Sequence, residues 1–341
     1  MSNLMKAIIR RHPFLVTSIL LLAAFLLSVA MGSVYIPPLN IIKSLLGIEN
    51  LQAVFNTILL EIRLPHAVLI ALTGAALAGS GTAYQGLFRN PLADPYLIGV
   101  ASGAGLGAIT MMARDWPKDW LGFYSVPAAA FLGALITVAV VYWIAKLGKT
   151  VPVTTLILAG VAVSSFATSL SSFLMMQSES ELRRSIAWLL GGSTLSGWQP
   201  VIAMLPYVLI GLIILLLSSY QLNVLQMGEE QAKQLGLPVE RIKLVLIIAA
   251  SLAAAAAVAF SGMIGFIGLV IPHSMRLIWG GDHRRLLPLS LLGGAAALLL
   301  ADALARILLA PQVVPVGIVT ALAGVPFFLW LLRRAKAQMY W

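Results

Sequence analysis

The chain has few charged residues. Of its 341 residues, 10% are Asp, Glu, Lys or Arg, whereas 60% are apolar. A soluble domain is about a quarter charged and under half apolar, so a water-soluble globule of this size could not cover its surface with so few charges. Disorder is excluded too, because disordered chains combine low hydrophobicity with high charge. The mean hydropathy of +0.97 indicates a helical membrane protein.

The chain also lacks the residue patterns of catalytic and metal sites. It has no cysteine, which excludes disulfides, thiolate metal sites and a cysteine nucleophile. The four histidines are scattered and show no metal-ligand spacing, and no Ser/His/Asp or paired-carboxylate arrangement stands out. The sequence therefore predicts no catalytic residue, no metal and no cofactor.

A nucleotide-binding loop is missing as well. Gly148-Lys149-Thr150 looks like the end of a phosphate-binding loop, but that motif needs a glycine five residues before its second glycine. Position 143 is Trp, and the strand-to-helix context is absent. We expect that the chain does not bind ATP and is not itself an enzyme.

Ten apolar segments are long enough, or nearly so, to cross a bilayer core of about 30 Å, which needs roughly 20 helical residues. They lie near residues 14–33, 64–88, 95–113, 123–145, 152–176, 199–220, 243–260, 264–279, 286–304 and 316–332. The first is longer than the apolar core of a signal peptide, roughly 7–15 residues, and is read as an uncleaved span. The fold class is therefore all-α: a polytopic membrane protein with ten transmembrane helices in one domain, 1–341.

Two of these regions are irregular. The eighth segment is short and ends in Pro272-His273, so it is expected to be broken or only partly spanning. The stretch 186–198 is apolar but rich in glycine, and is expected to lie outside the membrane or to re-enter it; the sequence leaves both open.

The charge is distributed unevenly across this topology. The chain has 22 Lys and Arg and 12 Asp and Glu, a net charge of +10. Ten spans put both termini on one side, which then carries 15 of the basic and five of the acidic residues. Lys and Arg collect in cytoplasmic loops. The bias predicts cytoplasmic N- and C-termini and requires no nucleic-acid partner.

The longest loop on that side, 221–243, has the features of a short helix. Helix-forming residues follow Gly228, Gly236 stands at the expected C′ position and Pro238 follows two residues later. The pattern places Ala232 and Leu235 on one side of this helix and so indicates a protein-docking element. The alternative is a solvated connector. On the same side, Pro91 and Pro95 force an extended turn.

The spans themselves carry almost no charge. Ion-coupled carriers usually hold ionisable groups deep in the bundle. The lack of such groups disfavours an ion-coupled secondary transporter, which is therefore the second hypothesis. A membrane-embedded enzyme is the third. Asp302 and Arg306 lie four residues apart and are expected to form a helical ion pair. Gly99, Gly103 and Gly107 predict close packing of helices.

Several motifs, in order and over essentially the whole chain, resemble the FecCD-type permease subunits of binding-protein-dependent ABC importers for iron chelates, haem and cobalamin. They are Arg63-Leu64-Pro65-His66, Gln85-Gly86-Leu87-Phe88-Arg89-Asn90-Pro91-Leu92-Ala93-Asp94-Pro95, Ala232-Lys233-Gln234-Leu235-Gly236, Gly262-Met263-Ile264-Gly265-Phe266-Ile267-Gly268-Leu269-Val270-Ile271-Pro272-His273, Asp282-His283-Arg284-Arg285-Leu286-Leu287-Pro288 and Pro315-Val316-Gly317-Ile318-Val319-Thr320.

The resemblance implies a set of partners and a cargo. It implies a pair of permease copies with the path between them, two cytoplasmic ATPase subunits, and a periplasmic or lipid-anchored binding protein, all at a bacterial inner membrane. It implies a metal chelate as cargo, with a ferric siderophore first and cobalamin or haem next.

The resemblance also implies roles for particular residues. Binding-protein docking falls on Arg63, His66 and Arg306, with His66 standing where the family often has Arg. ATPase coupling falls on Gly228, Glu229, Glu230, Ala232, Lys233, Leu235 and Gly236. The cytoplasmic gate falls on Asn90, Leu92, Val153 and Thr154.

Overall fold

The computed structural model describes residues 11–32, 36–45, 53–113, 122–177, 179–192, 195–310 and 312–339, and those residues form helices joined by short turns. Their only β pairs are two isolated bridges. Loop charges that the sequence analysis counted at residues 1–10, 49 and 114–119 lie outside these ranges, as does the last residue, 33, of the first predicted span.

Within the described residues, ten apolar helices account for the ten predicted segments. Seven are long enough to cross a membrane, counting α5 with the turns before it, and three are shorter. The long ones are α2 (Pro13–Ala30), α5 (Leu64–Leu87), α7 (Ser125–Ala145), α8 (Val153–Met175), α10 (Gln199–Leu217), α13 (Val239–Ser261) and α15 (His283–Leu308). The shorter ones are α6 (Val100–Ala113), α14 (Ile267–Trp279) and α16 (Val316–Met339), whose apolar part ends at Trp330.

Short helices connect them. They are α3 (Pro38–Leu45), α4 (Ala53–Thr57), a π-helical turn (Ile58–Arg63), two 3₁₀ turns (Pro95–Ile98 and Gly122–Tyr124), α9 (Glu179–Leu189), α11 (Ser219–Gln226) and α12 (Glu229–Gln234).

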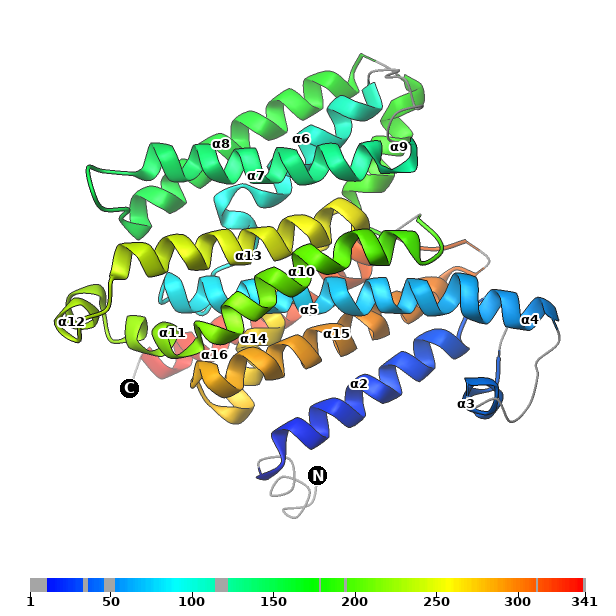
Figure 1. The fold of residues 1–341 in the computed structure, drawn as a ribbon. Coiled ribbons are helices and arrows are strands. Elements are labelled where there is room, and N and C mark those ends of the chain that lie inside the picture. Colours follow the sequence, from blue (N-terminus) through cyan, green and yellow to red (C-terminus); the bar gives the residue numbers. More distant parts are fainter. Residues whose placement is uncertain are drawn as a thin grey trace.

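The long helices form a bundle with α12 at one end and α9 at the other (Figure 1); we call these the α12 end and the α9 end. Helix α2 finishes beside Arg63, where α5 is about to begin, at the α9 end. Helix α16 starts beside Leu190, also at the α9 end. The start of α2 and the finish of α16 therefore lie at the α12 end, as an even number of spans requires.

Helix α5 runs through the centre of the bundle, and 19 of its 24 residues are buried. Where α5 crosses α15, Gly74 leaves no room for a side chain, because an added Cβ would lie 2.3 Å from the Gly294 carbonyl oxygen. Hydroxyls link α5 to α13, with Thr73 and Ser261 2.7 Å apart and Tyr84 and Ser251 2.8 Å apart. Close backbone approach and hydroxyl pairs are how helices associate without a hydrophobic driving force.

The glycine repeat in α6 has the predicted packing role. Cβ atoms on Gly103 and Gly107 would lie 2.5 Å and 2.1 Å from carbonyl oxygens of Gly133 and Ala129 in α7. Gly99, by contrast, precedes α6 and has φ +90°. The third span therefore begins at Val100, not near Pro95, because this left-handed residue ends the 3₁₀ turn.

The eighth segment is short, as predicted. Residues 262–266 are not helical, and the 13 residues of α14 reach about 20 Å at 1.5 Å per residue, less than a bilayer core. The irregular segment has a partner: Tyr96 donates its hydroxyl to the Ile264 carbonyl oxygen at 2.9 Å, and the Ile264 N–H donates back at 3.3 Å.

The predicted irregular stretch 186–198 includes residues 193 and 194, which lie outside the described ranges; its described part is partly helix and partly turn. Ile186–Leu189 completes α9, and the chain then turns through Gly191 and Gly192, both with positive φ. Gly192 donates its N–H to the Ser261 carbonyl oxygen at 2.8 Å. This stretch therefore packs on the irregular segment before α14.

Candidate functional site

The predicted docking loop contains the expected short helix. Gly228 has φ +116° and precedes α12, and Gly236 has φ +82° just after it, with Leu237 donating back to the Ala232 carbonyl oxygen at 3.0 Å. Both glycines therefore occupy positions where a side chain would be strained.

One detail of that helix differs from the prediction. Ala232 and Leu235 do not share a side: Ala232 is fully buried, whereas Leu235 is 65% exposed. The reason is that α12 ends at Gln234, so Leu235 caps it and points away from the bundle. Glu230, Lys233 and Gly236 are exposed around it, which leaves an apolar side chain within a polar surface at the α12 end.

Glu229 lies apart from that surface. Its carboxylate is 3.1 Å from the Nζ of Lys243, a buried lysine in the first turns of α13. The residues predicted to couple to the ATPase therefore include some that point outward and two, Glu229 and Ala232, that attach α12 to the bundle.

The predicted gate residues lie on two segments that meet deeper in the bundle. Asn90 is exposed and its side chain accepts the Leu92 N–H at 2.9 Å. Val153 and Thr154 begin α8. The close approach of the two segments is at Gly160, two turns further along α8, where a Cβ would lie 2.1 Å from the Leu97 carbonyl oxygen.

Helix α8 carries a hydroxyl face that the sequence analysis did not single out. It contains eight Ser or Thr residues. The exposed ones are Thr154, Ser165, Thr168, Ser169 and Ser172. An open groove of about 650 Å³ runs along this face, lined by Asp94, Tyr96, Leu97, Val161, Ser164, Ser165, Thr168 and Ser169.

The exposure of this face is informative because α8 is otherwise apolar. Some hydroxyls return to their own helix, such as Ser165 to the Val161 carbonyl oxygen at 2.9 Å, as lipid-facing hydroxyls can. The groove, however, also contains the carboxylate of Asp94. A charged group in hydrocarbon is costly and usually faces a water-filled space, which favours water over lipid in this groove. The signal available in the sequence was the spacing of the hydroxyls at 165, 168, 169 and 172.

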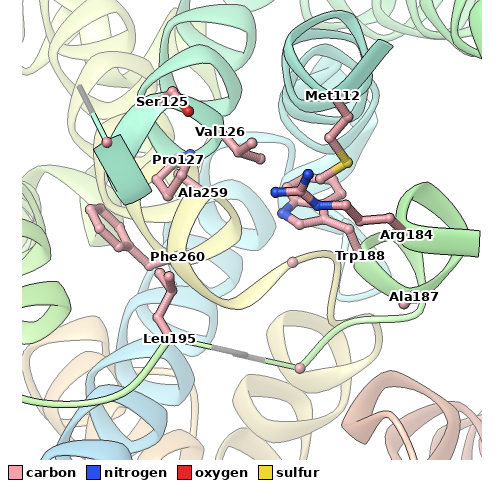
Figure 2. Close-up of a pocket in the computed structure, with 13 residues that line it drawn as sticks. Met112, Ser125, Val126, Pro127, Arg184, Ala187, Trp188, Leu195, Ala259 and Phe260 are labelled. Atoms are coloured by element: carbon pink, nitrogen blue, oxygen red, sulfur yellow. The ribbon is translucent and has the colours of Figure 1, made fainter. Parts of the chain in front are cut away.

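A second cavity lies near the α9 end. It has a volume of about 570 Å³ and its lining is mainly apolar. Figure 2 shows Arg184 and Trp188 of α9 and Met112 of α6 on one side, with Pro127 and Phe260 on the other. It separates α9 from the outer turns of α7 and α13.

The three predicted docking residues come together at the α9 end, with Asp302. Arg63 is 8% exposed and donates to the carbonyl oxygens of Val29 and Ala30 at 2.8 and 3.0 Å. Arg306 lies 2.9 Å from Asp302, confirming the predicted ion pair, and Asp302 also lies 3.1 Å from His66.

Both arginines therefore bind the last turn of α2. Arg306 donates to the Met31 and Ser28 carbonyl oxygens at 3.0 and 2.9 Å. The final carbonyls of a helix have no partner within the helix, and cations are favourable there. In this structure the two side chains act as caps for α2.

Comparison with known proteins agrees with this architecture. The family model described as the FecCD transport family matches residues 20–334. A permease from Bacillus subtilis, YvrB, is 42% identical and the match covers 92% of this chain and 91% of the relative. The hemin transport permease HmuU of Yersinia pestis is 40% identical over 96% and 98%, and the cobalamin import permease BtuC of Halobacterium salinarum is 47% identical over 85% and 76%.

A solved structure has the same fold. It is an inward-facing conformation of a transporter assigned to the metal-chelate type of ABC transporters, with TM-score 0.79, 32% identity and coverage of 93% of this chain and 97% of the other. With a family match over nearly the whole chain and relatives above 40% identity, the chain belongs to the FecCD transport family and is a multi-pass membrane permease of the ABC-importer type.

Proposed function

We propose that the chain is the transmembrane subunit of an ABC importer in the inner membrane, working as a pair of copies with two ATPase subunits at the α12 end and a substrate-binding protein at the α9 end. The α12 end is then cytoplasmic, with both termini. The single observation that carries the proposal is the hydroxyl face of α8, open in one copy, which suits the wall of a water-filled path completed by a second copy.

The cargo is a metal chelate. The ferric siderophore expected from the sequence has less support than cobalamin or haem, because the relatives above are named for hemin and cobalamin. A chelate rich in hydrogen-bonding groups also suits hydroxyl side chains. A ligand screen on the cognate binding protein tests this: tight binding of a corrinoid or haem is expected, and binding of siderophores alone would contradict it.

ATPase docking uses the exposed surface of α12. Leu235 is the apolar centre of that surface, and a docked subunit would bury it. We expect Leu235→Asp to reduce co-purification of the ATPase subunits about tenfold or more, because burying an unpaired carboxylate is costly. Arg241→Asp, an exposed site on α13, is the matched control. Normal co-purification of Leu235→Asp would contradict the role.

Binding-protein docking is proposed at the cluster of Arg63, His66 and Arg306. The acidic partner groups of a binding protein would meet the edge of this cluster, where His66 and Arg306 keep 21% and 15% of their side chains exposed. Charge-assisted hydrogen bonds suit that contact.

An ion-coupled carrier is the competing proposal. Uptake in proteoliposomes distinguishes them: uptake that needs ATP and the ATPase subunits supports the importer, whereas ion-driven uptake by the chain alone would contradict it.

A further inference from the structure

A buried lysine joins the docking helix to the turn that leads into α8. Lys243 is 3% exposed. Its Nζ lies 3.1 Å from a Glu229 carboxylate oxygen, 2.9 Å from a Glu240 carboxylate oxygen and 2.8 Å from the Val151 carbonyl oxygen. The contacts to Glu229 and Val151 are hydrogen bonds, and the contact to Glu240 is an ion pair within α13, so the ammonium joins three parts of the structure.

The backbone of Val151, which accepts from Lys243, is fixed by a second side chain as well. Val151 donates its own N–H to the second carboxylate oxygen of Glu240 at 3.0 Å, so its N–H and its C=O are both fixed by side chains of α13. Val151 is itself buried and precedes α8 by two residues. The turn before it is closed by two backbone hydrogen bonds between Leu147 and Thr150, and Thr155 donates to the Ala145 carbonyl oxygen at 3.1 Å.

These contacts connect α12, which carries the proposed docking surface, directly to the start of α8, which lines the proposed path. Glu229 is the first residue of α12, Lys243 lies in α13, and Val151 leads into the helix with the hydroxyl face. A shift of α12 that carries Glu229 must either stretch a partly buried ion pair or move Lys243, and with Lys243 the backbone at Val151.

Resting on the proposed function, we infer that Lys243 is a positioning residue that transmits movement of α12 to the start of α8. It contacts neither the ATPase nor the cargo. Its effect is on the ratio of substrate transported to ATP hydrolysed, and on the nucleotide dependence of the α8 N-terminus.

The experiment compares variants in the complex with the cognate ATPase subunits. Glu229→Gln weakens the α12 contact alone. Lys243→Met removes the centre of the cluster, and Lys243→Met/Glu229→Gln/Glu240→Gln also removes the charges of the two partly buried carboxylates that lose their ammonium partner in Lys243→Met. Arg241→Met is the control, because it removes an exposed cation from the same turn of α13.

Two readouts separate transmission from support of the fold. One is substrate taken up per ATP hydrolysed. The other is the rate at which a thiol reagent modifies Thr154→Cys with and without trapped nucleotide; the chain has no other cysteine. For Glu229→Gln and the triple variant we expect normal ATPase co-purification, uptake per ATP roughly tenfold lower, within the 5–150-fold range typical of coupling between sites, and loss of the nucleotide effect on Thr154→Cys.

The outcomes are distinct. A triple variant with wild-type uptake per ATP and an unchanged nucleotide effect on Thr154→Cys would overturn the inference, and lowered thermal stability in that variant would assign the cluster to support of the fold alone. Should Lys243→Met fail to fold, Glu229→Gln still decides. Failure of the unmodified chain to bind ATPase subunits would overturn the proposed function itself.

Discussion

At the scale of the residue, burial changes the meaning of Arg63. An outer arginine in a membrane permease suggests a free charge for a partner, yet this guanidinium faces the last carbonyls of α2. It follows that a substitution at Arg63 tests the attachment of α2 and the docking of a binding protein together, and the two effects need separate measurements.

Arg63→Met is therefore expected to lower the stability of the purified chain. The Val29 and Ala30 carbonyl oxygens would lose their charged donor. Ala30 keeps the Ile36 N–H at 3.1 Å, whereas loss of the donor to Val29 costs about 1–3 kcal/mol if that oxygen is left unpaired. Thermal unfolding in detergent measures this, with the exposed Arg183→Met at the same end as control. Equal melting of the two variants would contradict the capping role, and reduced stimulation of ATPase by the binding protein at unchanged stability would favour docking.

Some residue-level features were predictable and others were not. The Asp302–Arg306 pair follows from a spacing of four on one helix. The capping of α2 does not, because Arg63 lies 33 and 34 residues from its acceptors and no local pattern encodes that approach. The Lys243 cluster was invisible for the same reason: Val151 lies 92 residues away.

At the scale of the element, α5 and α14 approach each other so closely that a described glycine has no room for a side chain. A Cβ on Gly81 would lie 1.8 Å from the Gly268 carbonyl oxygen, which is backbone and cannot rotate away. The two helices could accept a side chain there only by separating, and separation would expose the backbone of the irregular segment before α14.

Gly81→Ala is accordingly expected to abolish stable expression or lower the melting temperature sharply. Gly105→Ala in α6 is the matched control, since its Cβ would meet only Leu189 at 3.5 Å, an ordinary contact; it should melt like the unmodified chain or slightly higher. Fluorescence-detected gel filtration after heating compares them. A Gly81→Ala chain as stable as Gly105→Ala would disprove the tight crossing.

The helices were largely predictable because apolar length alone locates a span. Boundaries failed where backbone conformation decides: Gly99 delays the start of α6, and α13 extends back to Val239 because its first turns are held by the polar Lys243 cluster. The end of α12 at Gln234 likewise redirected Leu235, which periodicity placed beside Ala232.

At the scale of the whole molecule, the open hydroxyl face of α8 is the feature on which the proposed pair of copies rests. A lipid-covered helix face would not be expected to carry exposed hydroxyls next to Asp94, because a carboxylate in hydrocarbon is costly. A second copy of the permease, facing the first across this groove, would enclose it.

Single cysteines test that assembly. We expect Ser165→Cys and Ser172→Cys, both on the exposed hydroxyl face, to react with a water-soluble thiol reagent in membranes, because the proposed path along this face is filled with water. Ser171→Cys is the control on the same helix turn, since Ser171 is buried. A reagent confined to lipid that reacts with the first two, while the water-soluble one does not, would place this face in the bilayer and contradict the path.

The hydrogen bond between Tyr96 and Ile264 also limits how early this part of the protein can be completed during synthesis. These residues are 168 positions apart, and a ribosome adding about 5–20 residues per second needs roughly 10 to 30 s to get from one to the other. Polar backbone at membrane depth must be satisfied by protein or water. Until Ile264 emerges, the Tyr96 hydroxyl lacks the partner that it has in the folded chain, so water or another group has to take that place.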